Sequence, residues 1–176
     1  MLVVNLFGAP GSGKSTGASY IFSCLKLAGI NAELVTEVAK DAVWDGATAP
    51  FQNQAYLFGN QCYRISRCDG KVDAVVTDSP LPLSILYNTA HPEVYTENFN
   101  KAVMDVFNSY DNMNVLLNRV KPYNPVGRNE SEEESDMLQP KLRALLDERG
   151  VNYVEEDGNI DGYNRIVDSV LAKMLV

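Results

Sequence analysis

The sequence predicts an α/β protein with a parallel sheet and helices on both faces. Short runs rich in Val and Leu alternate with longer segments of helical periodicity, which is typical of strand–helix–strand units. A glycine-rich turn joins the first apolar run to the first helical segment. The chain has 176 residues, of which 45% are hydrophobic and 22% charged, enough for one domain whose core needs no disulfides.

Five segments have the composition of buried strands. Their Val and Leu content fits strands that are covered on both faces of a parallel sheet. The expected strands are 2–7, 32–36, 73–77, 114–117 and 151–154.

Helical patterns lie between and after these strands. The expected helices are 15–28, one from 38, 51–68, 94–110, one from 131, and 162–174. Gly29 suits the end of the first helix, and Ser131 opens a run that resembles a capping box. Pro140 lies inside the helix that starts at Ser131, so we expect a kink or a restart there.

Composition and charge exclude several classes of function. The formal net charge is −8, so we expect no sequence-independent binding to nucleic acid. Cys24, Cys62 and Cys68 fit neither a disulfide framework nor a CxxC motif, and we interpret them as small core residues. No apolar run reaches the ~18 residues of a membrane span, and the N-terminus has no basic leader. We therefore expect a cytoplasmic protein without a membrane partner.

The most specific motif is a phosphate-binding loop. Residues 8–15 fit G-x-x-x-x-G-K-[ST] at each fixed position, between a predicted strand and a predicted helix. Backbone N–H groups of such a turn and the following helix N-terminus bind anions. We expect Lys14 to face the β- and γ-phosphates of ATP and Ser15 to bind Mg²⁺. The predicted nucleotide-binding residues are Gly8, Ala9, Pro10, Gly11, Ser12, Gly13, Lys14, Ser15 and Thr16.

Two carboxylates follow predicted strands, at the edge where open α/β sheets bind their ligands. Asp78 follows the third strand and suits the Mg²⁺ shell, although an aspartate there is also a good helix cap. Glu37 follows the second strand, and we expect it to accept a proton from a substrate hydroxyl or to hold that hydroxyl by a hydrogen bond. A solvated strand end is the alternative for Glu37.

Polar and aromatic residues near these strands leave two interpretations open. Gln61, Arg64 and Arg67 share one face of the third helix, which either meets a substrate or is simply solvated. Trp44 lies at helical spacing from Glu37 and either stacks on a base or packs in the core.

Residues 118–130 form a long connection with two prolines, a glycine and an unusual share of basic residues. Long structured connections of this kind are often lids over a ligand. We expect Arg119, Lys121 and Arg128 to close over ATP and neutralise charge on the transferring phosphoryl group, with a plain surface loop as the alternative.

Over nearly its whole length the chain resembles the small P-loop kinases of the nucleoside and nucleotide kinase group. It is most similar to phage-encoded members that are related to the kinase domain of NadR and to thymidylate kinases. The resemblance is carried by N-L-F-G-A-P-G-S-G-K-S-T over 5–16, E-L-V-T-E-V-A-K-D over 33–41, G-K-V-D over 70–73 with T-D-S-P-L over 77–81, and Y-N-P-V-G-R over 123–128.

The resemblance implies one P-loop kinase domain over residues 1–176, with a five-stranded parallel sheet of order 2-3-1-4-5 and a mobile lid. It implies that Glu37 lies near the acceptor hydroxyl, Arg119 beside the adenine and Arg128 near the phosphates. Nucleoside kinases usually carry an arginine directly after the acidic residue of the third strand, and this chain has Asp78-Ser79-Pro80 instead. The contacts of that arginine with the acceptor are therefore not expected here.

The sequence thus predicts an ATP- and Mg²⁺-dependent kinase, in the host cytoplasm if it is phage-encoded. The acceptor is expected to be nucleoside- or nucleotide-like, or 5-hydroxymethyl-deoxyuridine within DNA. The expected catalytic residues are Lys14, Glu37, Asp78, Arg119 and Arg128. The main alternative is a switch or assembly ATPase without a small acceptor. The sequence has no N/T-K-x-D motif of a switch GTPase, and intact phosphate-loop residues disfavour a non-catalytic nucleotide sensor.

Overall fold

The computed structural model describes residues 1–88, 91–128 and 130–174. Its centre is a five-stranded sheet in which all neighbouring strands run parallel, in the order β2-β3-β1-β4-β5. The strands are β1 (Leu2–Phe7), β2 (Ala32–Val35), β3 (Ala74–Thr77), β4 (Asp111–Asn118) and β5 (Val154–Asp157). The fold class and the strand order that the sequence predicts are confirmed.

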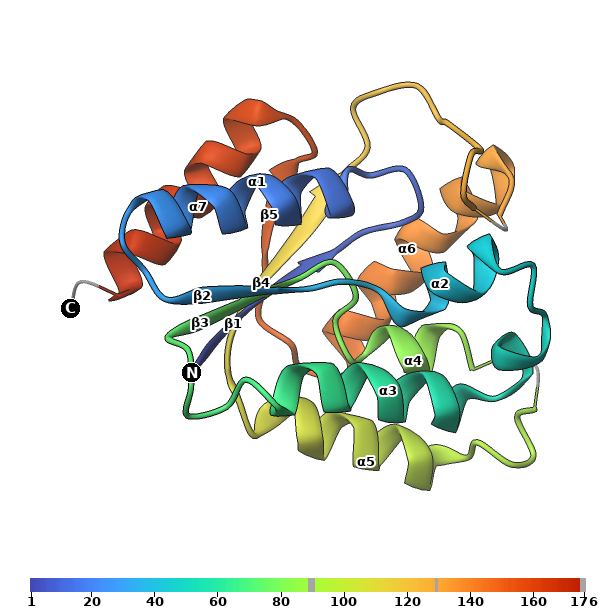
Figure 1. Ribbon diagram of the computed structural model, residues 1–176. Coiled ribbons are helices and arrows are strands. Elements are labelled where there is room, and N and C mark those ends of the chain that lie inside the picture. The colour runs from blue at the N-terminus through green and yellow to red at the C-terminus, as the bar shows by residue number, and fades with distance from the viewer. Residues whose placement is uncertain (89–90, 129, 175–176) are drawn as a thin grey trace.

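Helices cover both faces of this sheet (Figure 1). Helices α1 (Lys14–Leu27) and α7 (Ile160–Met174) pack side by side on one face. Helices α3 (Gln54–Ser66), α4 (Leu83–Leu86), α5 (Glu97–Asn108) and α6 (Glu132–Glu148) cover the other. Helix α2 (Val38–Trp44) and a 3₁₀ turn (Ala49–Gln52) link β2 to α3.

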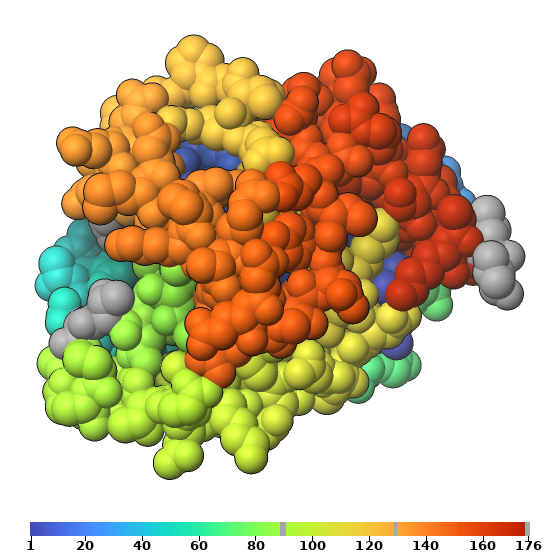
Figure 2. All heavy atoms as spheres, turned by 180° about the vertical axis from the view of Figure 1, so that it is seen from behind, coloured from blue at the N-terminus to red at the C-terminus, as the bar shows by residue number. Residues whose placement is uncertain are grey.

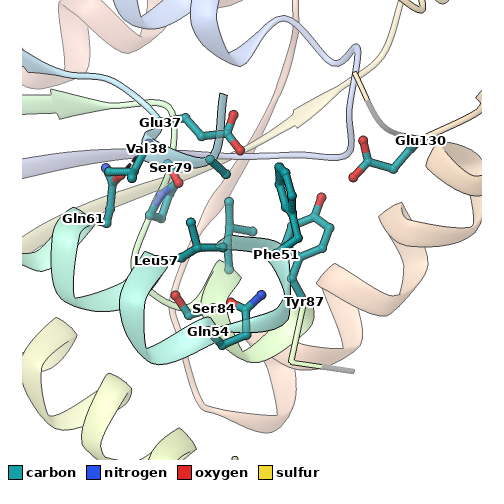
Figure 3. A pocket seen from close by; sticks show the side chains of 13 residues that line it. Glu37, Val38, Phe51, Gln54, Leu57, Gln61, Ser79, Ser84, Tyr87 and Glu130 are labelled. Atoms are coloured by element: carbon teal, nitrogen blue, oxygen red, sulfur yellow. Dashed lines mark hydrogen bonds between the residues drawn. The ribbon is translucent and has the colours of Figure 1, made fainter. Parts of the chain in front are cut away.

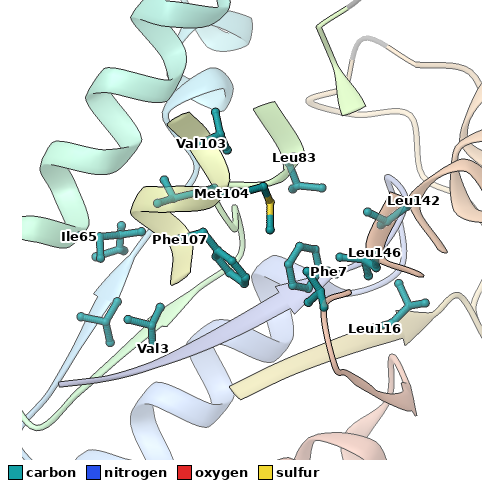
Figure 4. Packing of buried hydrophobic residues seen from close by; sticks show 14 of the residues in the cluster. Val3, Phe7, Ile65, Leu83, Val103, Met104, Phe107, Leu116, Leu142 and Leu146 are labelled. Carbon is teal, nitrogen blue, oxygen red and sulfur yellow. The ribbon is translucent and has the colours of Figure 1, made fainter. Parts of the chain in front are cut away.

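The central strand β1 divides the core into two halves, because successive side chains of a strand point to opposite faces. Val3 and Phe7 pack toward α3, α5 and α6, whereas Val4 and Leu6 pack toward α1 and α7. The rings of Phe7 and Phe107 meet edge to face at 6.4 Å between centroids (Figure 4). Burial on both faces explains why the sequence pattern identifies this strand without ambiguity.

Strand β5 begins three residues later than the apolar run that predicts it. Val151 is buried in the core before the strand starts, and Val154–Asp157 pair with the end of β4. Acidic residues fit this strand because it lies at the edge of the sheet and its side chains are largely exposed. Two of the carboxylates also form ion pairs, Glu155 with Arg143 and Glu156 with Arg165. Hydrophobicity alone therefore misplaces the strand.

Helix boundaries agree with the sequence in part. The capping box at the start of α6 is confirmed, because the Ser131 hydroxyl accepts from the Glu134 amide at 3.2 Å and the Glu134 carboxylate accepts from the Ser131 amide at 2.7 Å. The expected restart at Pro140 is wrong, since α6 runs uninterrupted past it. The buried leucines that follow Pro140 hold the second half of the helix against the core. Helix α4 is an element that the sequence pattern did not indicate.

The segment between β4 and α6 crosses over the start of the chain. Seen from behind, blue N-terminal atoms lie at the bottom of a hollow framed by this segment and by α6 (Figure 2). Of the three free cysteines, Cys68 is buried as expected, whereas Cys24 and Cys62 are only partly buried. In the described ranges, no helix has the length and apolar character that crossing a membrane requires.

Candidate functional site

The glycine-rich loop has the geometry of an anion cradle between β1 and α1. Gly8 and Gly13 have φ values of 150° and 98°. A Cβ atom at Gly8 would lie 2.3 Å from the Ser12 hydroxyl, and one at Gly13 would lie 2.3 Å from the Tyr163 hydroxyl. Both positions therefore require glycine. Helix α1 begins directly after Gly13, so the N–H groups of its first turn have no intrahelical partners and are free to bind phosphate oxygens.

Lys14 folds back across this loop. Its Nζ atom donates hydrogen bonds to the Gly8 carbonyl at 2.6 Å and to the Ala9 carbonyl at 3.2 Å. Burial lowers the pKa of the Lys14 ammonium, while the carboxylates of Glu37 and Asp78 act in the opposite direction. The cation thus sits at the centre of the site, within electrostatic reach of both carboxylates that the sequence predicts.

Asp78 follows β3 and is buried, with only 3% of its surface exposed. Among the described residues its Oδ1 atom has no hydrogen-bond partner, and the buried Ser12 hydroxyl is also unpartnered. A buried carboxylate oxygen without a partner fits a Mg²⁺ ion or a water of its shell, because Mg²⁺ prefers oxygen ligands. Ser15 is exposed at the start of α1, where its hydroxyl can serve as the second protein ligand.

A Mg²⁺ ion here would take most of its ligands from phosphates and water. In the part of the chain that the structure describes, no three His, Cys, Asp or Glu side chains gather into a metal cluster. Few protein ligands are what a Mg²⁺ site at nucleotide phosphates needs, since the ion usually keeps several waters. The residues present therefore fit the predicted cofactor pair of nucleotide and Mg²⁺.

Gln61 ties together the two strand ends that carry the carboxylates. Its buried amide donates to the Thr77 hydroxyl at 3.4 Å and accepts from the Val38 N–H at 3.1 Å. Thr77 directly precedes Asp78, and Val38 directly follows Glu37. The sequence placed Gln61 on a possible substrate-facing helix surface, but the structure uses it as a buried link between β3 and the start of α2.

Glu37 is half-buried at the start of α2. Burial raises the pKa of its carboxyl, and the nearby Asp78 and Glu130 carboxylates raise it further. The cations of Lys14 and Lys40 act in the opposite direction. A carboxylate with a raised pKa is a stronger base than an exposed one, which suits a group that accepts a proton.

Glu37 lies where two neighbouring cavities meet. The larger cavity, of about 190 Å³, extends below it between α2, α3 and α4 (Figure 3). The smaller one, of about 80 Å³, is bounded by the phosphate loop on one side and the segment before α6 on the other. Lys14, Lys40 and Arg128 line only the smaller cavity, while Glu37 and Glu130 line both. One cavity is therefore cationic and the other apolar with two carboxylates.

The segment before α6 is held by side-chain interactions. The guanidinium carbons of Arg119 and Arg128 lie 5.4 Å and 5.7 Å from the centre of the Tyr123 ring. Arg119 also pairs with Glu132 and Asp136 on α6. The Tyr123 ring packs on the phosphate loop, since a Cβ atom at Gly11 would lie 3.0 Å from it.

The structure brings Lys14, Glu37 and Arg128 together at the smaller cavity. Asp78 is close enough to influence the pKa values of Lys14 and Glu37. Arg119 approaches Gly11 but lines neither cavity among the described residues. The set of five predicted catalytic residues thus converges on one end of the sheet, with Arg119 at its margin.

The remaining candidates lie outside both cavities. Arg64 pairs with Asp41 at 2.7 Å, and Arg67 is exposed on α3. Trp44 is 64% exposed, so its interpretation as a core residue is wrong. Its ring lies against Gly127, where a Cβ atom would come within 2.9 Å.

Sequence reasoning missed three residues that fix the phosphate loop. The Ser135 hydroxyl donates to the Pro10 carbonyl at 2.7 Å, and the Gln139 side chain accepts from the Ala9 amide at 2.8 Å. The Tyr163 hydroxyl donates to the Gly13 carbonyl at 2.9 Å. The sequence contains an indication of Ser135 and Gln139, because they lie at helical spacing from Leu142. This spacing places their polar side chains on the buried face of α6.

Comparison with known families gives a match over most of the chain. A family model described as an AAA domain matches residues 3–162, which include the phosphate loop, both carboxylates and the segment before α6. None of the curated proteins matches the sequence.

Proposed function

The chain belongs to the AAA-domain family, and we propose that it is an ATP-dependent kinase, which transfers the γ-phosphoryl group to a hydroxyl or phosphate of a nucleoside- or nucleotide-like acceptor. The family and the phosphate loop imply nucleotide binding. The choice of a kinase rests on one observation: a second, mostly apolar cavity adjoins the cationic one, and Glu37 lines both. An acceptor in that cavity would meet the phosphates beside Glu37.

In the proposed reaction the phosphate loop and Lys14 hold the triphosphate. Mg²⁺, bound by Ser15 and Asp78, would neutralise charge on the phosphate oxygens. The oxygen of the acceptor hydroxyl bonds to the γ-phosphorus, and Glu37 accepts the proton that this hydroxyl loses. The bond between that phosphorus and the β–γ bridging oxygen breaks, and ADP leaves. Arg128 neutralises charge on the phosphoryl group in transit.

Residues 118–130 are proposed to act as a lid within a kinase domain that spans residues 1–176. Arg128 lines the smaller cavity, and its Nε atom donates to the Asn124 carbonyl at 2.8 Å, which holds the guanidinium over that cavity. Tyr123, which also belongs to this segment, packs on Gly11 of the phosphate loop. Closure of such a segment excludes water from the transferring group. Arg119 is proposed to lie beside the adenine.

A phosphate-transfer screen with labelled ATP tests this function. It offers nucleosides, nucleoside monophosphates, nicotinamide riboside and DNA that contains 5-hydroxymethyluracil. Wild type is expected to label at least one acceptor, and Lys14→Ala is expected to abolish that labelling because the cation at the β- and γ-phosphates is lost. Lys26→Ala, on the exposed end of α1, is a matched control that should retain activity. Transfer by Lys14→Ala at the wild-type rate would contradict the assignment of the donor site.

The second candidate function is an ATPase that drives an assembly and needs no small acceptor. The AAA-domain match supports it to the same degree as the kinase, because that family description fits hydrolysis as well as transfer. An ATPase of this kind would hydrolyse ATP, and none of the compounds in the screen would become phosphorylated.

A further inference from the structure

The larger cavity differs in charge from its neighbour. Its charged lining side chains, among the described residues, are the carboxylates of Glu37 and Glu130. The cations of Lys14, Lys40 and Arg128 line the smaller cavity instead. A phosphate group on a molecule in the larger cavity would therefore face two carboxylates and would find no cation in that cavity.

The two carboxylates act on the same space from different elements. Glu37 lies at the start of α2, whereas Glu130 comes from the segment before α6 and points toward the cavity from the opposite side (Figure 3). Tyr87 lies in the lining of the same cavity, and burial with the charges of Glu130 and Glu37 raises the pKa of its hydroxyl. Glu37 and Glu130 are only partly exposed, so water screens their negative charges less than it would on the open surface.

The polar groups at the other end of the cavity are uncharged. Gln54 is 5% exposed, and in the described ranges its amide makes no hydrogen bond, unlike that of Gln61. Its side chain lies beside the Ser84 hydroxyl, at the end away from Glu37 (Figure 3). Gln54 and Ser84 both line the cavity, so their polar groups can form hydrogen bonds with a molecule that enters it. The cavity thus offers donors and acceptors to a neutral molecule.

The walls between these two ends are apolar. Phe51 and Tyr87 lie along one side and Leu57 along the other (Figure 3). Aromatic and aliphatic walls with few polar groups at the ends favour a flat ring that carries hydrogen-bonding edges.

We infer that the larger cavity selects an acceptor alcohol that carries a flat ring and no phosphate, and that Glu130 is the residue that rejects phosphorylated acceptors. The inference rests on the proposed kinase function, since it assigns this cavity to the acceptor. It narrows the acceptor group from a hydroxyl or a phosphate to a hydroxyl. It also gives the segment before α6 a part in choosing the acceptor.

Binding measurements test the inference without requiring transfer. Each deoxynucleoside, including 5-hydroxymethyl-deoxyuridine, is titrated alongside its 5′-monophosphate by calorimetry, with a non-hydrolysable ATP analogue and Mg²⁺ present. Wild type is expected to bind at least one nucleoside about tenfold or more tightly than its monophosphate, because like charges that face each other in a buried site are strongly unfavourable. Glu130→Gln should reduce that ratio about tenfold by improving binding of the monophosphate.

Glu133→Gln is the matched control, because Glu133 is an exposed glutamate in the first turn of α6 and lines neither cavity. Its binding ratio should equal that of wild type. Equal or tighter binding of the monophosphate by wild type would overturn the inference, as would an unchanged ratio in Glu130→Gln. Failure of every nucleoside to bind would overturn the assignment of the cavity. Failure of the kinase proposal is read separately, from loss of labelling in the transfer screen.

Discussion

The phosphate loop and the segment before α6 face the same smaller cavity but are held in different ways. Buried or partly buried hydrogen bonds with Ser135, Gln139 and Tyr163 fix the carbonyl and amide groups of the loop. The segment is held by the ion pairs of Arg119, whose partners on α6 are about 60% exposed, and by the packing of the Tyr123 ring on Gly11. The loop is thus a rigid part of the fold, whereas the segment is attached by interactions that water and salt can weaken.

This difference suits a site with one fixed and one movable side. A cradle for phosphates gains from being formed before the ligand arrives, because no ordering cost remains to be met on binding. A segment that carries Arg128 must let nucleotide and acceptor enter and leave. Polar contacts at the surface suit a segment that opens and closes each time nucleotide and acceptor bind and leave.

The largest expected effect is on the movable side. Arg128→Ala should lower kcat by about 10³-fold with little change in ATP affinity, because the charge that it neutralises develops in the transition state. Lys121 is exposed and, unlike Arg128, lines neither cavity, so Lys121→Ala serves as the control and should change kcat by less than about threefold, far below that scale. Steady-state kinetics of both variants gives the answer. An equally small effect in Arg128→Ala would show that Arg128 is a surface residue.

Smaller effects, on the free energy of unfolding, are expected when the contacts that hold the phosphate loop or the segment before α6 are removed. Tyr163→Phe removes the buried hydrogen bond to the Gly13 carbonyl and should lower the free energy of unfolding by about 1 kcal/mol, independent of salt. Arg119→Ala should cost about 0.5 kcal/mol at low salt and less at high salt, because its partners are exposed. Urea unfolding of both variants at two salt concentrations separates them. The same salt dependence in both would remove the distinction between the two sides.

These contacts also explain how far the sequence could predict the site. The phosphate loop is a local motif, and Glu37 and Asp78 are found from their positions directly after strands. The residues that hold the loop lie more than 120 positions away along the chain, as the separations of 130, 125 and 150 show. No local pattern encodes such a pairing, so only the fold reveals it.

The same limit applies to the larger cavity and to β5. Glu130 lies in an acidic stretch of the sequence, and its position opposite Glu37 depends on how the segment crosses the sheet. Gln54 becomes part of the cavity only because the 3₁₀ turn before α3 and helix α4 enclose it. The sequence misplaces β5 because the limits of this strand are set by its backbone pairing with β4, which hydropathy does not report.

A further effect on stability, opposite in sign to these two, concerns the cost of keeping Glu37 in place. Its raised pKa means that the folded state holds the proton more tightly than the unfolded chain, so Glu37 lowers stability as pH rises from its unfolded value through its folded value. The groups that act on it are Lys14, Asp78, Glu130 and Lys40. Glu37→Gln without nucleotide should therefore raise Tm at pH 7.5.

The advantage of Glu37→Gln should shrink to near zero at about pH 3.5, well below the ordinary carboxyl pKa of 4.5, where Glu37 is protonated in both the folded and the unfolded states. Glu33→Gln, an exposed glutamate on β2, is the control and should leave Tm unchanged. Thermal unfolding at the two pH values measures both variants. A lower Tm for Glu37→Gln at pH 7.5 would mean that attraction to Lys14 outweighs the cost of burial.

Transfer and hydrolysis measured side by side in wild type and Glu37→Gln test the kinase proposal most directly. The substitution keeps the shape of the side chain and removes its negative charge. Phosphate transfer to an acceptor found in the screen should fall by about 10²-fold or more, while ATP binding and background hydrolysis change little. Equal loss of transfer and hydrolysis would contradict the assignment of Glu37 to the acceptor and favour an ATPase, and loss of neither would remove Glu37 from the site.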